Sequence, residues 1–179
     1  MLRIVSAIAS IKDHVKTMID SPDRYRPSCC PECGLKGLWA HGTYERKADR
    51  GSGHPNLVEV PRFICGKNGG CGASCSTLPS CVSPRRWYDW ATQAEVVKML
   101  LDGASLKACA RQLSRARSTV RRWWRWLEAQ HHRFAFELLT RHSEWGRFAR
   151  WQEFWQRALQ SESLEALMTS LDQAGVAVP

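Results

Sequence analysis

Two pairs of cysteines constrain the fold of the N-terminal half more than any other feature of the sequence. Cys30 and Cys33 are separated by two residues, Cys65 and Cys71 by five, and a glycine directly follows each pair. Two thiolates at short spacing can hold one metal ion from a tight turn, and a glycine behind them permits the backbone conformation that such a turn needs. We therefore expect two metal-binding knuckles.

The segment between the two pairs predicts a β-hairpin, with strands over 38–46 and 57–64. Two knuckles joined by a hairpin form a zinc ribbon, and four thiolates give a closed tetrahedral site that is structural rather than catalytic. The predicted ligands of a structural Zn²⁺ are Cys30, Cys33, Cys65 and Cys71. Because the second pair is wider than the usual two to four residues, Cys75 remains an alternative to Cys71.

The stretch 103–127 predicts two short helices joined by a tight turn at 114–116. Ser105 is placed to cap the first helix, and Ser118 or Thr119 to cap the second. Apolar residues recur at helical spacing on one face of each helix. The inward face of the second helix is expected to carry Val120, Trp123, Trp124 and Leu127. This pattern resembles the helix-turn-helix, whose second helix enters the major groove of DNA.

The same stretch holds seven basic residues and no acidic one, in a chain of 179 residues with a formal net charge of +9. Such a density repels itself unless an outside anion compensates it, and arginine pairs bidentately with phosphate. The alternative is a solvated basic surface. We predict contacts to double-stranded DNA, which suits a groove-reading helix better than RNA. The candidate residues are Arg111, Arg115, Arg117, Ser118, Thr119, Arg121, Arg122 and Arg125.

The expected architecture is mainly α-helical with a small β zinc ribbon that packs on the helix-turn-helix bundle. The predicted segments are an N-terminal strand and helix at 1–28, the ribbon at 29–82, the helix-turn-helix domain at 83–128 and a helical segment at 129–179. In the first segment the helix is expected to bury Ile8, Ile11, Val15 and Ile19. In the third, Ser83 and Pro84 predict a helix start.

Localisation and catalysis are predicted from what the sequence lacks. No apolar run is long enough to cross a bilayer, and charged residues interrupt the N-terminal apolar segment, so we expect a cytoplasmic protein without a membrane partner. Acidic residues after Glu128 are scattered along helical surfaces, and no paired carboxylates or nucleophile grouping stand out. We therefore expect no enzymatic activity. Trp145, Trp151 and Trp155 are interpreted as core or a dimer face rather than a base-stacking platform.

The layout resembles the zinc-ribbon and helix-turn-helix proteins of bacterial insertion sequences, such as InsA-like proteins and the N-terminal regions of some transposases. A group of proteobacterial transposase-like proteins is closer still. The matching features are YRPxxCPxCG at 25–34, Arg-Trp-Tyr at 86–88, VRRWWRWL at 120–127 and the closing AGVAVP. The resemblance implies binding to transposon ends or a transposon promoter, and it supplies no catalytic site.

The functional hypothesis is therefore a zinc-stabilised, sequence-specific DNA-binding protein that regulates or assists transposition. A second copy of the chain or a separate transposase is a candidate further partner. The alternative is an interaction adaptor that docks a separate transposase or another DNA-processing enzyme, with the basic helix in a supporting role.

Overall fold

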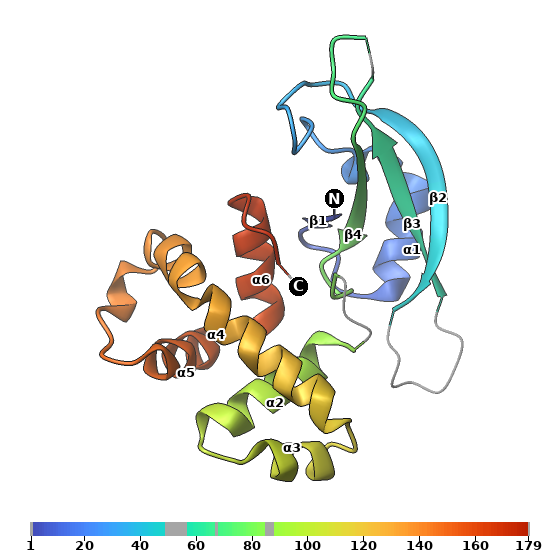
Figure 1. The fold of residues 1–179 in the computed structure, drawn as a ribbon. Helices are drawn as coiled ribbons and strands as arrows, with labels where there is room; N and C mark the ends of the chain where they lie inside the picture. Colours follow the sequence, from blue (N-terminus) through green and yellow to red (C-terminus); the bar gives the residue numbers. More distant parts are fainter. Residues whose placement is uncertain (1, 49–56, 67, 85–87, 179) are drawn as a thin grey trace. The chain divides into compact units, whose positions relative to one another are not determined.

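The computed structural model describes residues 2–48, 57–66, 68–84 and 88–178. The chain forms two compact units (Figure 1). The first, which we call the ribbon unit, comprises Met1–Asp89 together with Ala177–Pro179, and the second, the helical unit, comprises Trp90–Val176. Each unit has its own elements and core.

The ribbon unit is built on a four-stranded sheet in the order β1-β4-β3-β2. Its strands are β1 (Leu2–Val5), β2 (Trp39–Lys47), β3 (Leu57–Ile64) and β4 (Ser74–Pro79). Strands β2 and β3 pair antiparallel, which confirms the predicted hairpin. Strand β4 pairs antiparallel with β3 and parallel with β1, so the sheet is mixed.

The expectation of a mainly α-helical chain with only a small β ribbon is therefore wrong. Strands β1 and β4, four and six residues long, extend the hairpin on the β3 side. A two-stranded hairpin is marginal by itself, whereas added strands give it an apolar surface large enough to pack. The chain thus combines a mixed sheet with a separate set of helices.

Apolar clusters lie on both faces of this sheet. Phe63 of β3 and Cys75 of β4 are direct partners, and they pack with Ile8, Tyr25 and Leu38. Helix α1 (Ile11–Asp20) and the 3-10 helix η1 (Pro22–Tyr25) contribute to this cluster. Because side chains alternate along a strand, the opposite face carries the second cluster, which includes Val58, Val60 and Leu78.

Helix α1 buries a different face from the one predicted. Ile8 is fully buried, but Ile11, Val15 and Ile19 are 38%, 52% and 74% exposed. The buried face instead carries His14, one helical turn before the partly buried Met18. Hydrogen bonds explain this difference: His14 binds the buried Tyr25 and the backbone of β3, and these bonds determine which face of the helix turns toward the sheet.

The imidazole of His14 links three elements of the ribbon unit. Its Nε2 lies 2.9 Å from the carbonyl oxygen of Glu59, and its Nδ1 lies 2.5 Å from the hydroxyl of Tyr25. A carbonyl can only accept, so Nε2 carries the proton and Nδ1 accepts from Tyr25. Burial lowers the pKa of His14 below its usual 6.5, although the Glu59 carbonyl acts in the opposite direction.

The helical unit consists of five α-helices and a 3-10 helix in its described residues. They are α2 (Trp90–Leu101), α3 (Leu106–Gln112), α4 (Arg117–Leu139), η2 (Ser143–Trp145), α5 (Trp151–Ser161) and α6 (Leu164–Gln173). Helix α2 begins at Trp90 and not at Pro84, because the Ser83 hydroxyl donates to the Tyr88 carbonyl instead of capping a helix. Helix α4 continues through Glu128, where the sequence predicted a boundary between segments.

The core of the helical unit is aromatic. Trp145 and Trp155 are 6% and 0% exposed, which confirms that they pack inside. Phe154 contacts both of these rings edge-on. Trp151 is half-buried, and its ring centroid lies 4.7 Å from that of Trp124. Among the described helices, none combines the length and the apolar character that crossing a bilayer requires.

We expect the stability of the ribbon unit to fall as the pH drops below about 6.5, because His14 is neutral when folded and takes up a proton when unfolded. The loss should approach about 1.4 kcal/mol per pH unit until the lowered folded-state pKa is reached. Denaturant unfolding at several pH values between 8 and 5 measures this change in the free energy of unfolding. The variant His14→Gln should show a shallower pH dependence, and an unchanged dependence in this variant would refute the assignment.

Candidate functional site: a four-cysteine cluster and a basic helix pair

The four predicted cysteines come together in the ribbon unit. The sulfur atoms of Cys30, Cys33, Cys65 and Cys71 all lie within 4.8 Å of one another. The Cys30–Cys71 sulfur distance is 3.6 Å and the Cys33–Cys65 distance is 3.7 Å. A disulfide needs about 2.05 Å, whereas a tetrahedral metal with sulfur bonds of about 2.3 Å places its sulfurs roughly 3.8 Å apart. The cluster can therefore hold a metal ion.

The backbone of each knuckle explains how the sulfurs are aimed. In the first, the Cys30 N–H donates to the Leu35 carbonyl over 2.7 Å, and the Gly34 N–H donates to the Cys30 carbonyl over 2.8 Å. In the second, the Cys65 N–H donates to the Ala73 carbonyl over 2.9 Å. Gly34 and Gly72 have φ values of +74° and +72°. Both glycines thus take the left-handed conformation predicted for them.

The structure decides between the alternative ligands. Cys75 is buried, but its sulfur is not among the clustered sulfurs and instead lies 3.8 Å from the Ser76 carbonyl oxygen. Cys29 is exposed and also lies outside it. Within the described residues, no other group of three or more cysteine, histidine or carboxylate side chains is close enough to share a metal ion.

The protonation of the cluster favours a bound cation. Backbone hydrogen bonds from Leu35 and Cys71 lower the pKa of Cys33 to about 6. At Cys71 a hydrogen bond from Ala73 acts to lower the pKa, but burial and the neighbouring sulfurs outweigh it and raise the pKa to about 11. Four sulfurs this close cannot all become thiolates without a positive charge between them. A divalent ion supplies that charge.

Sequence reasoning missed one close approach in the cluster. A Cβ atom at Gly70 would overlap the Cys65 sulfur and the Gly66 carbonyl oxygen, and it would press against Leu35. Glycine is therefore required at position 70 because no side chain fits there, and not because of a special turn conformation. The adjacent pair of glycines within the second knuckle was the only signal in the sequence.

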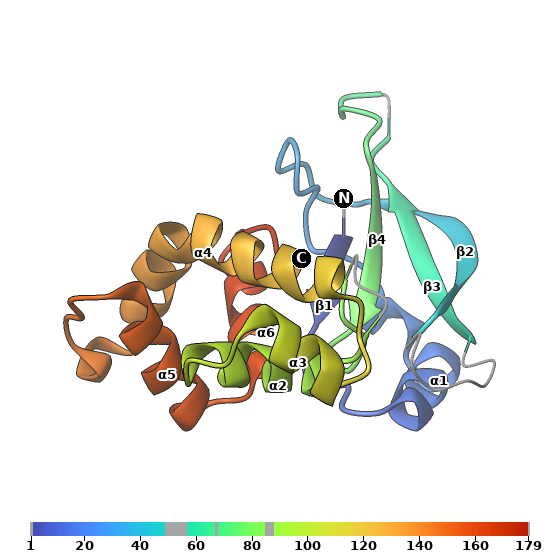
Figure 2. The ribbon, with the colours of Figure 1, turned by 60° about the horizontal axis from the view of Figure 1, so that its bottom comes forward.

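The basic stretch folds as a short helix, a turn and a long helix (Figure 2). Ser105 caps α3 by accepting a hydrogen bond from the Ala108 N–H over 3.1 Å, as predicted. Ser114 lies in the turn with a φ of +51°. This left-handed conformation is the one that glycine often provides in such a turn.

The predicted cap of the second helix is wrong. Helix α4 begins at Arg117, and Ala116 occupies the cap position without a side-chain hydrogen bond. The backbone N–H of Thr119 bonds to the Ala116 carbonyl, and its side chain is buried at 9% exposure. Ser118 points to solvent. Ser118 and Thr119 lie two and three positions past the cap position, too far into the helix to cap it.

The structure brings most of the predicted DNA-contacting residues to the surface. Arg115 is half-buried, and five arginines are exposed: Arg111, Arg117, Arg121, Arg122 and Arg125. In the part of the chain that the structure describes, none of these five forms an ion pair with an acidic side chain. The inward face of α4 is as expected, with Val120, Trp123 and Leu127 buried and Trp124 half-buried.

The amino end of α4 carries positive charge where the helix dipole makes it unfavourable. The first turn contains no acidic residue, begins with Arg117 and lacks a side-chain cap. The amino end of a helix already carries a partial positive charge from its unpaired amides, so cations there lower helix stability. An external anion would satisfy both the amides and the arginines.

The fold and the two sites define a two-unit class of protein, with a four-cysteine sheet followed by a helical unit that begins with a basic helix pair. Residues 30–123 match a family model described as a domain of unknown function, DUF6431, and they make up just over half of the chain. The chain belongs to this family. The matched region includes all four clustered cysteines and the first turns of α4. A search of curated proteins and a search of solved structures found no match.

We expect the substitution Gly70→Ala to weaken metal binding by about 10–100-fold, because the added methyl group displaces the Cys65 sulfur. Gly66→Ala is the matched control, since a Cβ there meets only the Trp39 ring, at 3.5 Å. Competition with a chromogenic chelator measures both affinities. Equal affinities of the two variants would contradict the close approach at Gly70.

Proposed function

We propose that this protein binds double-stranded DNA through α3 and the first turns of α4, and that its cysteine cluster holds a structural Zn²⁺. The observation that carries the DNA proposal is the set of exposed arginines around an uncapped helix start. A duplex supplies a regular array of phosphates that neutralises this charge, and its major groove accepts a helix. The charge arrangement that destabilises the free helix becomes favourable in such a complex.

The positions of these residues along the helices suggest which of them contact bases and which contact phosphates. Arg117, Ser118 and Arg121 lie in the first turns of α4, the part of a recognition helix that approaches base edges, and Arg122 is adjacent. Arg111 on α3 and Arg125, one turn further along α4, are placed to contact phosphates. Thr119 is buried and serves to position the helix start. Arg115 lies beside the turn and is assigned to phosphate contact.

Zinc is proposed because the donor set is four thiolates in tetrahedral spacing. Zn²⁺ prefers this set in structural sites, and a closed shell of four protein ligands leaves no position for a substrate. The ion would join the two knuckles to each other at the end of the β2–β3 hairpin. The residues that hold it are Cys30, Cys33, Cys65 and Cys71.

The biological role is proposed from the resemblance to insertion-sequence proteins. We infer a regulator or accessory factor of transposition that has no catalytic domain of its own and acts in the cytoplasm. Selection of bound sequences from random duplex DNA tests this role. Recovery of one motif that recurs at the ends or promoter of a mobile element supports it, and a lack of any sequence preference counts against it.

The double substitution Arg121→Ala and Arg122→Ala should weaken DNA binding by about 1–3 kcal/mol for each arginine that contacts a base. If the lost contacts are to phosphates, the slope of log affinity against log salt should flatten by about 0.9 for each. Fluorescence anisotropy across a salt series measures both quantities. The control is Arg133→Ala with Arg147→Ala, which removes the same charge from exposed sites in the same unit.

Two results would remove the basic helix pair from the mechanism. One is an equal loss of affinity in the control variant, since net charge alone would then explain the binding. The other is an absence of DNA binding together with salt-insensitive binding of a protein partner. That second result favours the adaptor function.

Purified protein should contain one zinc ion per chain, and Cys71→Ser should lose it while Cys29→Ser retains it. Cys71 belongs to the cluster, whereas Cys29 is an exposed neighbour of Cys30 outside it. Elemental analysis gives the stoichiometry, and Co²⁺ substitution should produce the visible bands of a tetrahedral thiolate site. Removal of the ion by a strong chelator should unfold the ribbon unit. Full retention of metal by Cys71→Ser would exclude this ligand set.

A further inference from the structure

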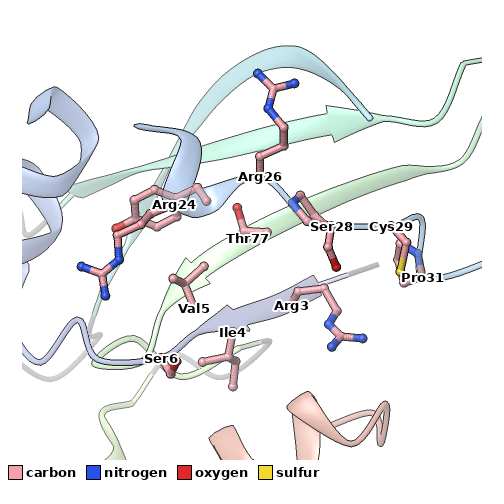
Figure 3. Close-up of a pocket in the computed structure, with 12 residues that line it drawn as sticks. Arg3, Ile4, Val5, Ser6, Arg24, Arg26, Ser28, Cys29, Pro31 and Thr77 are labelled. Carbon is pink, nitrogen blue, oxygen red and sulfur yellow. The ribbon is translucent and has the colours of Figure 1, made fainter. Parts of the chain in front are cut away.

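A cavity of about 280 Å³ lies in the ribbon unit, next to the first knuckle, where Cys29 and Pro31 on either side of Cys30 line it. Its walls come from β1, from Thr77 of β4, from the end of η1 and from the chain that leads to the first knuckle (Figure 3). This volume is close to the lower limit of small-molecule pockets, about 300 Å³. It fits one compact chemical group and part of the molecule that carries it.

The charge of the cavity is positive. Three arginines line it, Arg3, Arg24 and Arg26, and no acidic residue does. Arg26 is held in place: it donates to the Leu38 carbonyl over 2.7 Å and lies over the Phe63 ring. Its Nε also pairs with the exposed carboxylate of Asp23 over 3.2 Å, so part of its charge is already compensated. In Figure 3 its guanidinium points away from Thr77, while Arg24 extends on the η1 side and Arg3 on the side of Cys29 and Pro31.

The second observation is an unsatisfied hydroxyl in the same cavity. Thr77 is 2% exposed, and its Oγ1 atom is buried without a hydrogen-bond partner. A buried hydroxyl in this state is unfavourable relative to one that is bonded. Thr77 is the direct partner of Arg3 in the β1–β4 ladder. The two residues therefore lie side by side on adjacent strands. Valine would have the same shape without this cost.

We propose that this cavity binds a phosphoryl group. A phosphate offers several acceptor oxygens at once, and it suits a site with arginines on opposite sides and hydroxyl donors between them. Ser6 and Ser28 line the cavity with Thr77 and add further hydroxyls. Val5 and Pro27 add apolar surface for the carbon part of the ligand. This site is separate from the helix pair and does not depend on the DNA proposal.

The experiment uses ¹⁵N-labelled full-length protein titrated with thymidine 5′-monophosphate, and with thymidine as the phosphate-free control. We expect saturable shifts of the backbone signals of Arg3, Arg24 and Thr77 with the nucleotide only. Thr77→Val and Arg24→Gln should each weaken this binding about tenfold or more. Thr77→Ser should retain it because the hydroxyl remains, and Lys16→Gln, an exposed charge on α1, should have no effect.

Two further probes distinguish the source of the phosphoryl group. Inorganic phosphate tests for a small phosphorylated ligand, and a short thymidine oligonucleotide without a terminal phosphate tests for a nucleic-acid backbone. Saturable binding of either probe that Thr77→Val weakens supports the proposal and identifies the source. Repeating the oligonucleotide titration in the Arg121→Ala and Arg122→Ala variant separates this site from the helix pair.

The proposal is overturned if thymidine and its monophosphate give the same shifts, or if Thr77→Val and Arg24→Gln bind as tightly as the unchanged protein. Thr77→Val should fold at least as well as the parent, because it removes an unsatisfied polar atom. A marked loss of its thermal stability would show that the hydroxyl has a structural partner, and this result also overturns the proposal.

Discussion

The mutual repulsion of four closely spaced sulfurs is the constraint on which the ribbon unit depends. Cys30 and Cys65 are buried, while Cys33 and Cys71 reach the surface, and the four sulfurs bring the two knuckles together. Without a cation, the knuckles must keep protons on most of the thiols to stay together. With one, the same sulfurs become thiolates and connect two segments that are more than thirty residues apart in the sequence. The hairpin between them is thereby closed at one end.

A second electrostatic imbalance marks the helical unit. Helix α4 starts without a side-chain cap and carries Arg117 in its first turn, where the helix dipole disfavours a positive charge. Packing of Val120, Trp123 and Leu127 into the unit compensates for this loss. The first turn of α4 is thus less stable than it would be with a capping side chain and an acidic residue. Residues that break a local rule in this way are expected where a ligand later supplies the missing interaction.

The sequence predicted the parts of the fold that depend on local patterns. Cysteine spacing predicted the four clustered cysteines, the segment between the two pairs predicted the hairpin with β3 over 57–64, and Ser105 marked a helix start. Each of these signals lies within a short stretch of sequence. Strand β4 and its pairing with β1 escaped prediction, since parallel pairing joins segments about seventy residues apart. The face of α1 was mispredicted for the same reason: the long-range bonds of His14 override the apolar stripe.

Long-range placement also explains why the cavity at Thr77 has no signal in the sequence. Arg3, Arg24 and Thr77 come from three separate segments, and no spacing rule connects them. The helix pair presents its arginines on exposed turns of two successive helices, whereas the cavity gathers its charges around a buried hydroxyl. An exposed array suits a long polyanion, and a small cavity suits a single group. The two proposed sites would therefore select different kinds of anion, although both proposals rely on arginine.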